Sequence, residues 1–98
     1  MKKTNSMNCI YDEKDAVIDI SELQKKTQKD VVSLFKAVRK NKKLTQLELS
    51  KKTHIPQPNI TRFESDKSNP TLELLVKVAA AYNMRVVIGL EEIEDEKK

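Results

Sequence analysis

The chain has 98 residues, a length that fits one domain with one modest hydrophobic core. Aromatic residues make up 4% of it, and it contains one Gly and three Pro, so its core must be largely aliphatic and helical rather than a turn-rich β-sandwich. One His, one Cys and one Gly cannot build a metal cluster, a nucleophile-base pair or a phosphate-cradling loop. Composition therefore predicts a protein that is not an enzyme and has no cofactor and no metal.

The net charge of +4 hides an uneven distribution. Five of the fifteen acids lie in the last eight residues, so residues 1–90 carry 17 Lys or Arg against 10 Asp or Glu. A basic body of this kind favours a polyanionic partner. The sequence has neither the apolar core of a signal peptide nor a run of about 20 apolar residues. With a single cysteine as well, we expect a cytoplasmic protein with no membrane attachment.

Residues 1–28 are predicted to form an N-terminal extension. The β-branched stretch Ala16–Ile20 indicates a short strand. Ser21–Gln24 then has the form of a capping box, so a helix is expected to begin near Glu22. Whether this helix breaks near residues 27–28 is left open by the pattern.

A central domain is predicted over residues 29–83, and its first helix is expected from Asp30 onward. Apolar side chains recur there at helical spacing, while Lys36, Arg39 and Lys40 are expected to face away. The apolar positions are Val31, Leu34, Phe35 and Val38.

Two short helices are predicted next, each with several independent start signals. Thr45–Glu48 is a capping box, and Leu44 and Leu49 occupy the positions of a hydrophobic staple around a helix that ends near Thr53. Ile55 and Ile60 repeat the staple around a further helix that runs to about Glu64. Pro56 and Pro58 fall at its start, where the first-turn amides lack intrahelical partners.

A fourth helix is predicted after Thr71, a good N-cap residue, and Asn83 can end it in the left-handed conformation. Its apolar stripe is expected at Leu72, Leu75, Val78, Ala79 and Tyr82. Residues 84–98 are predicted to form a short strand, Met84–Leu90, followed by an acidic tail. A lone strand is not stable, so we expect this one to pair with Ala16–Ile20 or with its copy in a second subunit.

Two short helices joined by a tight turn can place the second helix in the major groove of DNA. Ser50 lies where the two helices must cross closely, and His54 occupies the turn position that requires positive φ. The segments Leu44-Thr45-Gln46-x-Glu48-Leu49-Ser50, Ile55-x-Gln57-x-x-Ile60-Thr61-Arg62-Phe63-Glu64 and Asn69-Pro70-Thr71-Leu72 resemble the XRE (Cro/C1-type) helix-turn-helix family.

The resemblance implies an all-α, lambda-repressor-like helix-turn-helix bundle, to which the sequence adds the N-terminal extension and the short C-terminal β-strand. Two positions depart from the family, which usually has Gly where this chain has His54 and Asp66. Both residues tolerate left-handed geometry, so the departures affect local stability rather than the fold.

The outward face of the predicted third helix supplies the candidate base contacts, because Ile60 and Phe63 face the core. Amide side chains pair with adenine, Arg pairs with guanine, and a Thr methyl can contact thymine. The expected base readers are Gln57, Asn59, Thr61 and Arg62.

Contacts to the DNA backbone are expected around this helix. By the family resemblance Gln46 is placed to contact a phosphate, and the resemblance also implies a structural ion pair between Arg39 and Glu64. Further phosphate contacts are expected from Lys43, Ser65, Lys67 and Asn69.

The favoured function is a sequence-specific double-stranded DNA-binding transcriptional repressor that acts as a homodimer on a pseudo-palindromic operator. The alternative is a HigA-type antitoxin, which neutralises a small toxin protein and represses its own operon. RNA binding is the weaker option, because the aromatic side chains that stack on single-stranded RNA are missing.

Overall fold

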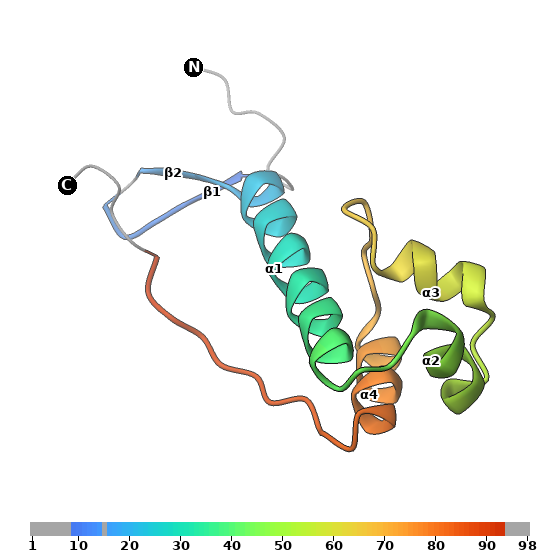
Figure 1. Cartoon of the computed structure of the whole chain (residues 1–98). Helices are drawn as coiled ribbons and strands as arrows, with labels where there is room; N and C mark the ends of the chain where they lie inside the picture. Colours follow the sequence, from blue (N-terminus) through green and yellow to red (C-terminus); the bar gives the residue numbers. More distant parts are fainter. Residues whose placement is uncertain (1–8, 15, 94–98) are drawn as a thin grey trace.

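The computed structural model describes residues 9–14 and 16–93. The elements follow the order β1 (Cys9–Tyr11), β2 (Val17–Asp19), α1 (Ile20–Asn41), α2 (Gln46–Thr53), α3 (Gln57–Phe63) and α4 (Leu72–Ala81). In Figure 1 the three short helices gather beside the C-terminal half of α1, while the N-terminal half of α1 carries the two strands beyond the bundle. The domain is therefore mostly helical, as the sequence predicted, with its small sheet at the N-terminal side.

The two strands form an antiparallel hairpin in which Ile10 pairs with Ile18. The turn is held by the carboxylate of Asp12, whose Oδ1 accepts hydrogen bonds from the backbone N–H groups of Lys14 and Ala16, both at 2.8 Å. The predicted strand at Ala16–Ile20 is present as β2, but its partner is β1 and not the Met84–Leu90 segment. A hairpin needs only a short loop to close, so the neighbouring segment is favoured over one that four helices separate from β2 in the sequence.

Helix α1 is continuous from Ile20 to Asn41 and passes through residues 27–28 without a break. Its N-cap is Asp19, whose side chain accepts hydrogen bonds from the backbone N–H groups of Ser21 and Glu22. The predicted start at Glu22 was therefore two residues late, because the Asp19 carboxylate, two residues before the expected Ser21 cap, accepts the hydrogen bonds of the free amides instead.

The buried face of α1 differs from the predicted one. Leu34 is 61% exposed, whereas Val32 and Arg39 are buried. Phe35 and Val38 do pack against the core, as expected. Spacing alone could not select between neighbouring faces here, because α1 touches the small bundle over only its C-terminal half and carries a buried charge among its core residues.

The helix-turn-helix unit is fixed by local chemistry at both helix starts. The capping box is complete, since Thr45 Oγ1 accepts from the Glu48 amide and Glu48 Oε1 accepts from the Thr45 amide. In the turn His54 adopts the left-handed conformation with φ of 62°, and Ser50 Oγ donates to the carbonyl of Ile55 where α2 and α3 meet. These features confirm the predicted capping box, turn residue and crossing point. Helix α3 follows Pro56, with Pro58 in its first turn.

The core lies among α2, α3, α4 and the C-terminal half of α1. Its fully buried members are Leu49, Ile60, Phe63, Val78 and Tyr82. Phe35 packs edge-on against Phe63, with ring centroids 5.8 Å apart. Thr71 caps α4 through its hydroxyl as predicted, but Leu72 is 57% exposed and Leu74 packs on the core in its place.

Residues 84–93 contain no helix or strand, so the expected C-terminal strand is not confirmed. Among the described residues no backbone hydrogen bond is made by residues 85–93. Val87, Ile88 and Leu90 are 78%, 71% and 100% exposed, so the described residues of one copy supply no partner for this β-branched stretch. No helix within the described ranges is long and apolar enough to span a membrane.

Candidate nucleic-acid interface

Helix α3 presents its polar side chains to solvent while its apolar ones hold it in place. Ile60 and Phe63 are 1% and 3% exposed and anchor the helix in the core. The four expected base readers, Gln57, Asn59, Thr61 and Arg62, are all exposed. The structure thus brings them together on one short helix whose orientation is set by the buried face.

A chain of side-chain hydrogen bonds runs from the core to this surface. Arg39 donates from Nε and Nη2 to the two carboxylate oxygens of Glu64, at 2.8 and 3.0 Å. Gln46 Nε2 donates to Glu64 Oε1 at 3.1 Å, and Thr61 Oγ1 donates to Gln46 Oε1 at 2.8 Å. The buried pair is thus linked through Gln46 to an exposed residue of α3.

The ion pair ties three elements together. Arg39 also donates from Nη1 to the carbonyl of Leu44, which precedes α2, and Glu64 directly follows α3. The two charged side chains are only 9% and 2% exposed, so the paired hydrogen bonds must offset a large desolvation cost. No buried side-chain nitrogen or oxygen in the described part of the chain lacks a hydrogen-bond partner.

This environment shifts two ionisation equilibria. The hydrogen bonds from Arg39 to Glu64 raise the pKa of the guanidinium above its usual value, although burial works in the opposite direction. Burial, with a smaller contribution from the nearby Glu64 carboxylate, raises the pKa of Tyr82 to about 12. The Tyr82 hydroxyl donates to the carbonyl of Phe35 at 3.2 Å, so it remains a neutral donor next to the buried pair.

A shallow groove joins the exposed face of α3 to the connection that follows it. Arg62 donates from Nη2 to Asn59 Oδ1 at 2.8 Å, which holds both side chains along the helix. The groove has a volume of about 340 Å³, and it brings Asn59 and Arg62 together with Lys67 and Asn69. Two expected base contacts therefore share one surface depression with two expected phosphate contacts.

The remaining expected phosphate contacts flank α2 and α3. Ser65 is partly buried, and its hydroxyl donates to the carbonyl of Arg62 at 2.8 Å. Lys43 is exposed, just before α2, and has a left-handed backbone with φ of 59°. Asp66, by contrast, does not have positive φ, so only His54 of the two expected glycine replacements uses that geometry.

Two features of this surface were missed from the sequence. The left-handed Lys43 had a weak signal in the sequence, because the chain must turn from α1 into α2 within the four residues 42–45. Nothing in the sequence pattern indicated the hydrogen bond between Gln46 and Thr61, since it joins residues fifteen positions apart. In the ranges 9–14 and 16–93 no group of three His, Cys, Asp or Glu residues could hold a metal ion.

Two short helices joined by a pinned tight turn, with the exposed polar face on the second, define a helix-turn-helix DNA-binding domain. A family model described as Helix-turn-helix matches residues 35–87, more than half of the chain. The chain belongs to this helix-turn-helix family, which confirms the resemblance drawn from its motifs.

Two kinds of curated relative are similar to the chain. An immunity repressor protein of Bacillus phage phi105 is 35% identical over 66 residues, which cover 65% of this chain and 46% of the relative. Antitoxin HigA1 of Mycobacterium tuberculosis is 34% identical over 61 residues, which cover 62% of this chain and 41% of the relative. The matched region is therefore less than half of either relative. No solved structure matches the chain. One relative is named as a repressor and the other as an antitoxin.

Proposed function

We propose that this chain is a sequence-specific repressor, not an enzyme, that binds double-stranded DNA as a dimer on a pseudo-palindromic operator. The observation that carries the proposal is the exposed polar face of α3. Gln57, Thr61 and Arg62 extend from a helix that is anchored by Ile60 and Phe63 and braced by the Arg39–Glu64 pair. In this proposal α3 enters the major groove, and Gln46, Lys43, Ser65, Lys67 and Asn69 contact the flanking phosphates.

The binding is expected to weaken steeply as salt is added. Each phosphate neutralised by Lys or Arg contributes a slope of about −0.9 to a plot of log affinity against log salt concentration. Fluorescence anisotropy with a duplex selected by the protein from a random pool measures this slope. An affinity that does not change between roughly 50 and 200 mM salt would contradict DNA binding through this surface.

A second copy is proposed to dock on the segment 84–93. This segment has exposed apolar side chains, and the backbone groups of residues 85–93 make no hydrogen bond to the described part of the chain. Residues 84–87 border an apolar hollow of about 290 Å³ against Leu34, Phe35 and Val38 of α1. Antiparallel pairing of two such segments would satisfy the backbone and cover Ile88. It would also supply the two-fold symmetry that a palindromic operator requires.

Ile88→Lys is expected to shift the protein from dimer to monomer, because two like charges would then face each other across the paired segments. Size-exclusion chromatography with light scattering measures the mass. Leu72→Lys is the matched control, since Leu72 is 57% exposed on α4 and lies outside the segment. A dimer that persists in the Ile88 variant, or one that dissociates equally in both variants, would place the interface elsewhere.

An antitoxin is the second candidate, supported by the similarity to antitoxin HigA1. In that case residues 84–93, the hairpin or both would bind a small toxin protein. Co-expression of the tagged chain with the open reading frame next to its gene tests this directly. Co-purification of a one-to-one complex that the Ile88→Lys variant no longer forms would favour the antitoxin. If the protein encoded next door does not co-purify with the tagged chain, the plain repressor is favoured.

A further inference from the structure

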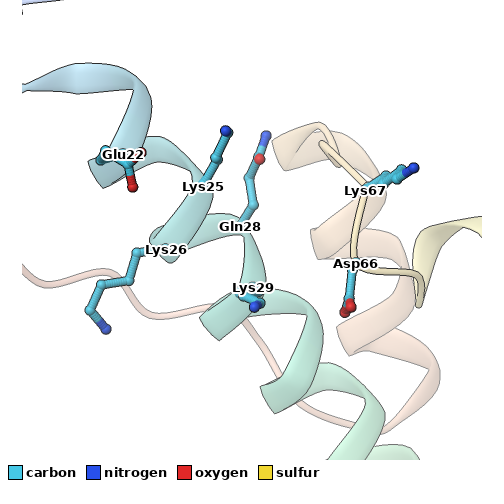
Figure 2. A pocket seen from close by; sticks show the side chains of 7 residues that line it. All are labelled: Glu22, Lys25, Lys26, Gln28, Lys29, Asp66 and Lys67. Atoms are coloured by element: carbon cyan, nitrogen blue, oxygen red, sulfur yellow. The ribbon is translucent and has the colours of Figure 1, made fainter.

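A basic surface lies on the N-terminal half of α1, away from the helix-turn-helix itself. A hollow of about 700 Å³ opens there between α1 and the connection from α3 to α4 (Figure 2). Four lysines and two carboxylates line it together with Gln28, and no apolar side chain does. The charged residues are Lys25, Lys26, Lys29, Lys67, Glu22 and Asp66.

Three of the four lysines make no ion pair in the part of the chain that the structure describes. Lys26 pairs with Asp30, at 3.2 Å, and Figure 2 shows it on the side of α1 away from the α3–α4 connection. No ion pair is made by Lys25, Lys29 or Lys67 within the described residues. Four lysines against two carboxylates leave this hollow with a net positive charge, which attracts an anion. A protein-docking or lipid-docking surface would instead offer apolar side chains, and none lines the hollow among the described residues.

Lys67 connects this surface to the expected DNA interface. It lines the α1 hollow, and it also lines the groove that holds Asn59, Arg62 and Asn69. A DNA strand whose phosphates contact Lys67 therefore has the α1 lysines beside it. Lys25 and Lys29 are four residues apart on one helix, about 6 Å along its axis, so they share a face and can reach phosphates of the same strand.

We propose that Lys25 and Lys29 bind backbone phosphates of the duplex that flanks the half-site read by α3. Through them α1, a helix outside the recognition motif, extends the footprint of each subunit. This inference rests on the proposed function, because it uses the same DNA molecule. It adds affinity but no sequence preference, since phosphate contacts carry no base information.

The test compares Lys25→Gln/Lys29→Gln with Lys36→Gln/Lys40→Gln. The control pair lies on the same helix, is exposed, and removes the same charge, but lines neither the hollow nor the groove. A dimer of the first variant loses two phosphate contacts in each subunit, four in all, so the magnitude of its salt slope should fall by about 3.6. Its loss of affinity relative to the wild type should therefore shrink about 150-fold between roughly 50 and 200 mM salt. The control should show little change in slope.

A second arm uses duplex length. The selected duplex is tested with about ten flanking base pairs on each side and again without these flanks. We expect the Lys25→Gln/Lys29→Gln variant to bind the long duplex more weakly than the wild type does, and to bind the short duplex equally well. The inference would be overturned if both lysine pairs lowered the DNA affinity equally, or if the variant still bound the short duplex more weakly than the wild type. Neither result would contradict the proposed DNA binding by α3. If the wild-type protein binds no duplex at all, the proposed function fails with it.

The other anionic partner is tested in parallel with vesicles that contain anionic phospholipid. Vesicle binding that the Lys25→Gln/Lys29→Gln variant loses, combined with unchanged DNA binding, would overturn the inference in favour of a membrane surface. Circular dichroism confirms that the variants keep their helix content, as expected for exposed lysines.

Discussion

Replacing Arg39 with methionine is expected to destabilise the domain by about 3–5 kcal/mol, because it leaves the Glu64 carboxylate buried without its partner. Glu64 is 6% exposed and receives two of its hydrogen bonds from Arg39, and the Leu44 carbonyl loses a donor at the same time. A loss of this size is a large part of the free energy of unfolding of a typical domain. Urea denaturation followed by circular dichroism gives the free energy of unfolding.

The double variant Arg39→Met/Glu64→Leu separates the cost of a stranded charge from the value of the pair. Replacing both partners with apolar residues of similar size is often neutral or stabilising. We therefore expect the double variant to recover most of the lost stability, except for two hydrogen bonds: the one from Gln46 to Glu64 and the one from Arg39 to the Leu44 carbonyl. A single variant that costs less than about 1 kcal/mol would show that the carboxylate escapes to water, contrary to the buried geometry.

Gln57→Ala is expected to weaken binding to the selected duplex by about 1–3 kcal/mol, or roughly 5- to 150-fold, for each half-site that a subunit of the dimer reads, without affecting the fold. Gln57 is exposed, and its side chain makes no hydrogen bond within the described part of the chain, so its removal leaves no protein group unpaired. The measurement is an anisotropy titration of both proteins with the selected duplex and with duplexes substituted at each position.

The control for Gln57→Ala is a duplex of mixed sequence. A residue that reads a base should leave the non-specific affinity and the salt slope unchanged, since no counterion is released at its contact. Preference at one operator position should relax at the same time. An equal loss on specific and mixed duplexes would mean that Gln57 contacts the backbone, and it would move base reading to the other exposed positions of α3.

The features predicted well from sequence are those set by neighbours in the chain. Thr45 caps its helix with an amide three residues away, and His54 and Asn83 adopt the expected left-handed conformation. Such interactions need only local geometry, so residue type and spacing determine them. The core of α3 was also predictable, because Ile60 and Phe63 fall on one side of a short helix with polar neighbours on the other.

The features predicted badly depend on partners far along the chain. The β-branched Met84–Leu90 stretch has the propensity of a strand, but β2 pairs with β1 and leaves it exposed. Leu34 has the right spacing for the core and yet is 61% exposed, because it lies at an open hollow between α1 and residues 84–87 rather than against another helix of the described chain. The Arg39–Glu64 pair, which joins residues 25 positions apart, was reached through family resemblance and not through spacing. The proposed contacts to DNA remain predictions.

The hydrogen bond between Thr61 and Gln46 constrains any attempt to redesign the operator preference. Thr61 is connected through Gln46 to the buried carboxylate of Glu64, so a new side chain at either position also alters a network that supports the fold. Gln57 makes no such connection in the described residues. A library that varies Gln57 first should therefore yield folded proteins with altered operator preferences. Variation at Gln46 or Thr61 is expected to lower the stability of the fold whenever it changes the operator preference.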